Sequence, residues 1–355
     1  MKSRQSGILL FMIAVITLTG CVGCGKRETG KKEEGRTQEV ASQSGDGSGV
    51  QGDGVETGAD DSFAGGEFPE PVPVFVENSY GYEVWKKEKT QIRMPGGVLF
   101  DGKDLLVCDM GNHCVVRLTT NGDFVESYGE LGSEEGNFVT PTAILFHEDE
   151  IYVLDSGNMR IQVFDTDMNY NREIWFEGSP LPSDGKYHDM AIAGDGTIYI
   201  AADASYGEGT SLFYIEGGEL CVVSGGAFGY LAEQGGMVYA ADNYRYYKYE
   251  KGYGWKPGEN WVYQVDRTGL ERVCELPYMY APVDFVIMDD VLYTLSPVWG
   301  KMNRVSMDGE PSETMFYIEE VQSHAMYLCV QDENTFYVAD TQGFLYKVFR
   351  TEGEE

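Results

Sequence analysis

Two of the four histidines in this 355-residue chain could belong to one metal site. His188 and His324 each stand at the start of an apolar, strand-like segment, and the carboxylates of Asp189 and Asp284 are close to such starts. Imidazole nitrogens and carboxylate oxygens are ligands that divalent metals accept. We therefore treat His188, Asp189, Asp284 and His324 as a candidate metal site. The alternative is that each histidine only hydrogen-bonds a loop.

A second candidate site is the aromatic stretch NYRYYKYEKGYGWKPGENW, at residues 243–261. Tyrosine and tryptophan on a protrusion suit stacking on sugars or packing against a protein partner. The alternative is a long hairpin whose aromatic side chains pack on one another and on their neighbours. The candidate ligand-binding residues are Tyr246, Tyr247, Tyr249, Tyr253, Trp255 and Trp261.

The sequence contains no G-x-S-x-G elbow, H-E-x-x-H motif or Walker loop, so no catalytic residue is assigned. The segment DTDMNYNRE, at residues 165–173, lacks the glycine and the final carboxylate of an EF-hand loop and favours a hairpin turn. A net charge of −32 repels phosphates and argues against a nucleic-acid partner.

A repeated strand pattern supplies the scaffold that these residues need. A short strand of apolar and aromatic residues, ending in a small or acidic residue, recurs six times. The six strands end at Asp109, Asp155, Ala202, Asp242, Ser296 and Asp340. A period of about 40 to 50 residues with several strands per unit is typical of a β-propeller. The pattern therefore predicts an all-β, six-bladed β-propeller of four-stranded blades over residues 69–355.

The sixth unit is one strand short, because it ends with LYKVFR at residues 345–350. The segment YEVWKKEKTQ, at residues 82–91, precedes the first unit and belongs to no other. We expect this N-terminal segment to complete the last blade and close the ring. Closure would remove the open edge that an unclosed array exposes.

The first two units resemble the NHL-repeat family of propellers. The resemblance is carried by Pro95, Asp109, Gly111-Asn112-His113 and the tract 128–138, and then by Pro141, Asp155, Gly157-Asn158 and Arg160-Ile161. We expect the Asp to cap the turn and the Gly and Asn to accept positive φ. The first unit departs from the family pattern by placing Cys114 where the family prefers arginine. The resemblance implies a propeller, and some enzymes of this fold use metals at the central channel.

The N-terminus carries an export signal. Lys2 and Arg4 precede an apolar segment at residues 8–18, and Leu18-Thr19-Gly20-Cys21 resembles a bacterial lipobox. The resemblance implies cleavage before Cys21 and lipidation of its thiol, which would tether the protein to the extracytoplasmic face of a membrane. We expect a signal peptide at 1–20, the lipidated cysteine with a disordered linker at 21–68, and the propeller at 69–355.

These observations favour a surface lipoprotein whose propeller is a binding scaffold for a protein or a glycan. One alternative is a metal-dependent hydrolase or lyase with its site at the channel mouth. Another is an accessory subunit of an envelope transporter or sensor. The five cysteines of the propeller are scattered and odd in number, so we expect buried apolar thiols rather than a disulfide framework.

Overall fold

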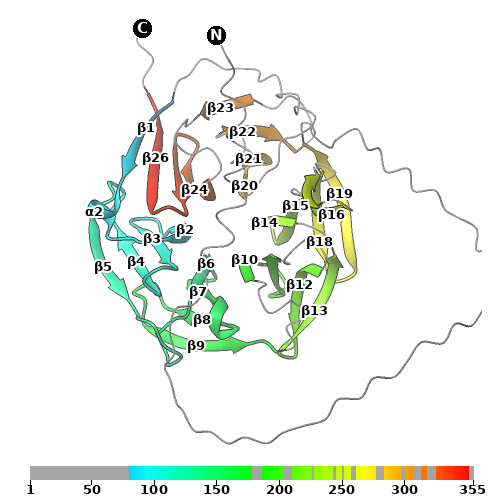
Figure 1. Ribbon diagram of the computed structural model, residues 1–355, viewed down its shortest axis with the longest axis horizontal. Helices are drawn as coiled ribbons and strands as arrows, with labels where there is room; N and C mark the ends of the chain where they lie inside the picture. The colour runs from blue at the N-terminus through cyan, green and yellow to red at the C-terminus, as the bar shows by residue number, and fades with distance from the viewer. Residues whose placement is uncertain are drawn as a thin grey trace, which may run out of the picture. The chain divides into compact units, whose positions relative to one another are not determined.

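The computed structural model shows six four-stranded antiparallel sheets arranged in a ring (Figure 1). The structure describes residues 80–177, 186–203, 210–225, 228–242, 245–249, 252–256, 261–276, 284–296, 301–307, 313–317 and 325–351. The predicted six-bladed β-propeller is therefore confirmed.

Each blade runs from its innermost strand to its outermost strand. Blade 1 contains β2 (Pro95–Phe100), β3 (Leu105–Asp109), β4 (Cys114–Leu118) and β5 (Phe124–Tyr128). Blade 2 contains β6 (Pro141–His147), β7 (Glu150–Asp155), β8 (Arg160–Phe164) and β9 (Tyr170–Trp175). Blade 3 contains β10 (Lys186–Ile192), β11 (Ile198–Asp203), β12 (Thr210–Glu216) and β13 (Glu219–Gly225).

The remaining blades follow the same order. Blade 4 contains β14 (Phe228–Gln234), β15 (Met237–Asp242), β18 (Trp261–Asp266) and β19 (Gly269–Glu275). Blade 5 contains β20 (Asp284–Met288), β21 (Val291–Ser296), β22 (Lys301–Ser306) and β23 (Glu313–Tyr317). Blade 6 contains β24 (Ala325–Asp332), β25 (Thr335–Asp340), β26 (Phe344–Arg350) and β1 (Tyr80–Trp85).

The ring closes through the N-terminal strand, as expected. β1 pairs antiparallel with β26, from Tyr80 opposite Arg350 to Trp85 opposite Leu345. Trp85 is 2% exposed, and its ring lies 5.9 Å from that of Tyr337. The segment departs from the expectation after Trp85, because α2 (Lys87–Thr90) replaces the continued strand. The chain thus turns away from blade 6 before it enters blade 1.

The turn between β7 and β8 shows why this segment forms a hairpin. Asp155 is fully buried and accepts hydrogen bonds from Val139 N (2.7 Å) and Asn158 Nδ2 (2.8 Å). It precedes η2 (Ser156–Asn158) without capping the backbone of that turn, whereas in blade 1 Asp109 Oδ1 does cap its turn by accepting from Gly111 N and Asn112 N, both at 3.1 Å. The expected positive φ at glycine and asparagine is wrong, because Met159 is the left-handed residue. Gly157 is needed for space, since a Cβ there would lie 2.6 Å from the carbonyl oxygen of Val139.

The apolar core lies between neighbouring blades. One buried cluster joins Leu154 and Ile161 of blade 2 to Ile200 and Phe213 of blade 3. This follows from the two-residue period of the strands, which directs successive side chains toward opposite faces of each sheet. Four thiols are buried and that of Cys221 is half-buried, which confirms the expectation of unpaired cysteines among the described residues.

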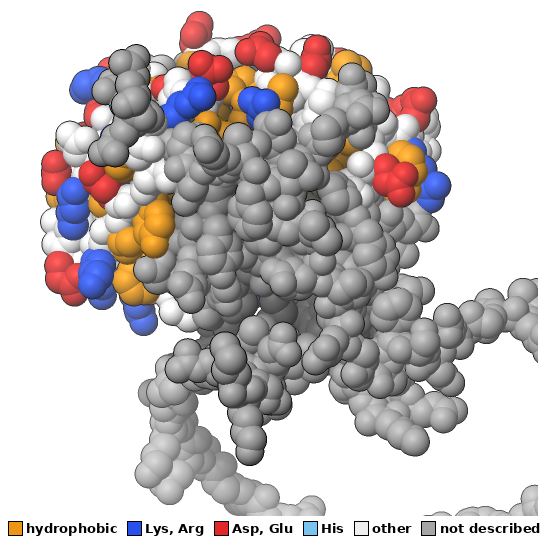
Figure 2. Space-filling model, turned by 90° about the horizontal axis from the view of Figure 1, so that it is seen from above, with side chains coloured by type: hydrophobic (Ala, Val, Ile, Leu, Met, Phe, Trp, Pro, Cys, Tyr) orange, Lys and Arg blue, Asp and Glu red, His pale blue; other side chains and the backbone are white. Residues whose placement is uncertain are grey.

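The predicted signal peptide, lipidated Cys21 and linker lie outside the described residues, so the anchor and the domain limits stay predictions. No helix in the described part is long and apolar enough to cross a bilayer. Figure 2 shows described Asp and Glu side chains scattered over the face in view, among fewer Lys and Arg side chains.

Candidate functional site

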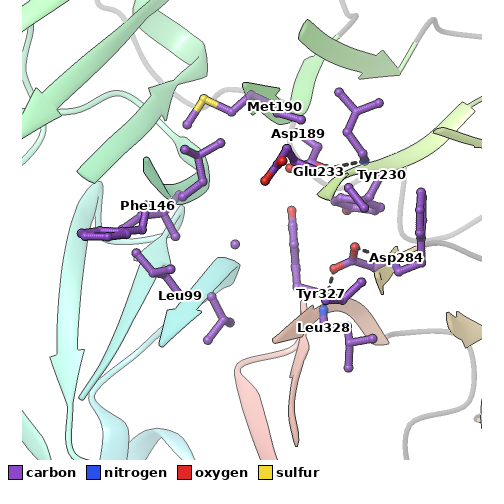
Figure 3. A pocket seen from close by; sticks show the side chains of 18 of the residues that line it. Leu99, Phe146, Asp189, Met190, Tyr230, Glu233, Asp284, Tyr327 and Leu328 are labelled. Carbon is purple, nitrogen blue, oxygen red and sulfur yellow. Dashed lines mark hydrogen bonds between the residues drawn. The ribbon is translucent and has the colours of Figure 1, made fainter. Parts of the chain in front are cut away.

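A cavity of about 390 Å³ occupies the middle of the ring (Figure 3). Its lining comes from the six innermost strands, β2, β6, β10, β14, β20 and β24. Leu99 and Phe146 lie on one side of this channel, and Asp189 and Asp284 lie across from them. The two carboxylates of blades 3 and 5 therefore lie across the channel from apolar side chains of blades 1 and 2.

Strand register identifies one ring of equivalent positions along the channel. In each blade we count back two positions from the repeated strand end named above (Asp109, Asp155, Ala202, Asp242, Ser296 or Asp340), and the member is the residue just before the pairing partner of that position. In blade order these residues are Gly97, Ala143, Asp189, Tyr230, Asp284 and Tyr327. Aspartate and tyrosine thus alternate in blades 3 to 6, whereas blades 1 and 2 carry residues with little or no side chain.

The small residues let β2 and β6 approach directly. A Cβ added to Gly97 would lie 3.0 Å from the backbone nitrogen of Ile144, so a larger residue would push the two strands apart. In blades 3 and 5 the equivalent position holds a carboxylate instead, and this carboxylate bridges to the next blade.

Asp189 and Asp284 each bind a backbone amide of the following blade. Asp189 Oδ2 accepts a hydrogen bond from Leu231 N, and Asp284 Oδ2 accepts one from Leu328 N, both at 2.6 Å. Asp284 Oδ1 also accepts from Phe285 N at 2.8 Å. The inner edge of each blade has no neighbouring strand, so its amides need other acceptors. The two carboxylates supply acceptors and link blade 3 to blade 4 and blade 5 to blade 6.

Buried aromatic rings cross the same part of the channel. The ring of His188 lies 4.9 Å from that of Tyr230, which lies 5.2 Å from that of Tyr327, both in edge-to-face geometry. The hydroxyl of Tyr327 reaches the sulfur of Met110 at 3.9 Å. This aromatic bridge, defined as His188, Tyr230 and Tyr327, thus connects blades 3, 4 and 6 and touches blade 1.

The electrostatics of the channel favour protonated carboxyl groups. Burial raises the pKa of Asp189 to about 6, although its hydrogen bond from Leu231 and the nearby His188 oppose the rise. Burial, together with the charge of Asp189, raises the pKa of Asp284 well above its usual range. Each carboxyl group therefore keeps its proton to a higher pH than an exposed aspartate does.

The structure brings part of the predicted metal site together. Asp189 and Asp284 both line the channel, and His188 is buried beside them in the aromatic bridge. His324 lies outside the described residues. The described part of the chain contains no group of three or more side chains with metal-ligating chemistry, so the metal site stays a prediction.

The sequence alignment of the two histidines differs from the observed register. Tyr187, not His188, pairs with Ala202 and so is level with Pro95 and Pro141 of the first two blades. A bulge between Tyr187 and Asp189 accommodates His188. The sequence analysis also missed Tyr230 and Tyr327, because only the strand register shows that they are level with the two aspartates.

The predicted aromatic protrusion forms a hairpin of its own. β16 (Arg245–Tyr249) pairs with β17 (Gly252–Lys256) in a separate two-stranded sheet, with Tyr246 opposite Trp255. Tyr247, Tyr249 and Tyr253 belong to the same two strands, whose backbone alone is described. Trp261 begins β18 instead, where it is half-buried with Arg272 stacked on its ring at 5.1 Å.

Topology places this hairpin at the same end of the propeller as the aspartates. The hairpin is inserted after Asp242, and Asp242 pairs with Phe228 at the start of innermost strand β14. The ring of equivalent positions also lies near the starts of the innermost strands. Both candidate sites therefore belong to one end of the ring, which we call the entry face.

Comparisons with known proteins support the fold. No family model matches the chain, and no curated protein sequence matches it. A structural genomics protein of unknown function from Bacteroides thetaiotaomicron is similar, with a TM-score of 0.54 and 11% identity over 76% of each chain. Virginiamycin B lyase from Staphylococcus aureus with quinupristin has a TM-score of 0.52 and 12% identity, and the match covers 76% of this chain and 99% of the lyase.

Aldose sugar dehydrogenase from Streptomyces coelicolor in its PQQ-bound form gives a TM-score of 0.51 and 12% identity, covering 77% of this chain and 98% of that enzyme. The fold is therefore shared with enzymes of different reactions. At these identities the likeness establishes the propeller and assigns no activity.

Proposed function

We propose that the protein is a membrane-anchored, extracytoplasmic binding protein whose entry face receives a protein or glycan partner. The observation that carries this proposal is the hairpin β16–β17, which interrupts blade 4 between β15 and β18 and joins none of the six blade sheets. A hairpin that adds nothing to its blade is typical of an inserted recognition element, since function in such folds is concentrated in loops.

The composition of the insertion supports recognition of an acidic or sugar-rich surface. Residues 243–260 contain four basic and two acidic residues, in a chain whose net charge is −32. Five tyrosines and Trp255 accompany them. Aromatic and basic residues together suit stacking on sugars and attraction to acidic groups.

A photo-crosslinker introduced at Trp255 tests the entry face in intact cells. We expect a covalent adduct with a protein or with envelope glycan, because the hairpin would lie against the partner. The matched control is Val125 on outermost strand β5, which is 45% exposed and lies outside the entry face. Equal adducts from both positions, or none from position 255, would contradict the proposal.

The proposed anchor has its own test. Incorporation of radioactive palmitate should be lost in a Cys21→Ser variant and retained in Cys24→Ser, since only Cys21 has the lipobox before it. Loss in Cys24→Ser alone would move the anchor to that residue, and labelling of both variants would remove it.

A further inference from the structure

We propose that the central channel binds a small organic cation, with a primary ammonium group held between the carboxyl groups of Asp189 and Asp284. This channel site is separate from the surface recognised by the hairpin, so either proposal can fail alone. Asp189, Tyr230, Asp284 and Tyr327 surround one part of the cavity (Figure 3).

The cavity brings carboxyl groups together without a lysine or arginine to pair with them among its described lining residues. The carboxylates of Asp189 and Asp284 lie close enough for each to influence ionisation of the pair. A buried carboxylate is costly unless it is paired, and a cationic ligand would provide the pairing. The volume of about 390 Å³ lies in the range of small-molecule sites.

The donors and acceptors fit an ammonium better than a hard divalent metal. Both oxygens of Asp284 already accept backbone N–H groups, at 2.8 and 2.6 Å. Each carboxylate oxygen has two acceptor positions, so one per oxygen remains for an N–H donor. Calcium requires six to eight oxygen ligands, and the described residues gather no such set.

The aromatic rings add a second attraction for the same charge. Tyr230 and Tyr327 are 4% and 6% exposed, and their rings lie 5.2 Å apart beside the carboxylates. An aromatic ring face attracts an ammonium group in a desolvated site, whereas a divalent metal keeps oxygen ligands around it. Aspartate and tyrosine in alternate blades therefore provide both charge and aromatic surface for one ammonium group.

Asp189 and Asp284 supply the acidic side chains at this level of the channel. β2 and β6 contribute Gly97 and Ala143 at the equivalent positions and add no charge there. The titratable groups facing the pair are His188, Tyr230 and Tyr327, with Glu233 and His147 elsewhere in the lining.

The experiment measures binding of n-butylammonium to the full chain by calorimetry at about pH 8. Asp189→Asn should lose at least about tenfold in affinity, since it removes one charge and keeps the side-chain shape. Near-ultraviolet circular dichroism checks its folding.

Glu271→Gln is the matched control. Glu271 is exposed on outermost strand β19 and is not among the described residues that line the channel. This variant should bind n-butylammonium as the original protein does. The proposal is overturned by absence of binding to the original chain or by equal losses in both variants. Displacement of n-butylammonium by an equal concentration of calcium would also overturn it and favour a metal site.

Discussion

Replacement of Arg160 by methionine should strongly destabilise blade 2. Arg160 is 1% exposed, and its guanidinium donates to Asp155 Oδ2 at 2.9 Å and to Glu173 Oε2 at 2.7 Å. It also donates to the carbonyl oxygens of Glu134 at 3.0 Å and Asn137 at 2.9 Å. Methionine fills much of the same volume but supplies no donor.

The magnitude follows from the groups left behind. Removing one member of a buried ion pair costs about 3–5 kcal/mol. Asp155 keeps its bonds from Val139 and Asn158, and the side chain of Glu173 is 27% exposed and can rehydrate. We therefore expect the free energy of unfolding to fall by about 3–4 kcal/mol. Adding Asp155→Asn to Arg160→Met should recover part of this loss, because it removes the uncompensated charge.

Urea unfolding followed by tryptophan fluorescence measures the effect. With an m-value of about 3 kcal/mol/M, the midpoint should move down by about 1 M. Cys114 occupies the equivalent place in blade 1, where Asp109 is satisfied by Asn112 and by backbone amides instead. Cys114→Ala should therefore cost only about 1 kcal/mol. A loss of unfolding free energy below about 1 kcal/mol in Arg160→Met would refute the assignment of Arg160 as the residue that neutralises buried Asp155 in blade 2.

Three further predictions concern the channel, the ring closure and the thiols. Because the folded pKa of Asp189 is raised to about 6, ionisation of this residue destabilises the fold as the pH rises from about 4 through 6. Asp189→Asn should therefore gain about 2–3 kcal/mol of unfolding free energy relative to the original protein between about pH 4 and about pH 8, and parallel pH–stability curves would contradict this. Trp85→Ala should lower the free energy of unfolding by about 3–5 kcal/mol in thermal or urea melts. Val84→Ala, at a residue that is 39% exposed, should lower it by less than about 0.5 kcal/mol. Similar losses in the two variants would mean that β1 does not pack as described. Ellman's reagent should modify Cys221 in the native propeller before Cys108, because burial raises the pKa of the Cys108 thiol well above its usual range. Cys221→Ser should remove that early reaction. Early labelling that persists in the variant would show that another thiol is accessible.

The sequence allowed prediction of the blades because their signal is local. Alternating apolar residues and the Asp109 and Asp155 turns recur within each unit, and ring closure followed from one unassigned strand. The site was harder to predict because it depends on register between distant strands. The sequence alignment took His188 as level with Pro95 and Pro141, whereas the register gives Tyr187, and the alignment did not reveal Tyr230 and Tyr327.

The reason why the turn requires glycine was also not predictable from the residue type. Gly157 suits a left-handed backbone, but the structure uses its missing side chain for contact with Val139, a residue from a preceding loop. Such close approaches arise only when the blades are assembled. Sequence spacing therefore indicated where the turn lies but not which of its properties the fold requires.

Because β1 pairs with β26, the sixth blade needs strands from both ends of the propeller sequence. Tyr80 can pair with Arg350 only after the residues between them have been synthesised, so β1 stays unpaired through most of translation. Closing so long a loop is also slow. A chain cut short before β26 would leave the apolar side chain of Trp85 without its blade and one propeller edge unpaired, and both are signals that proteases and chaperones recognise. Blade 6 can therefore form only after β26 has been synthesised.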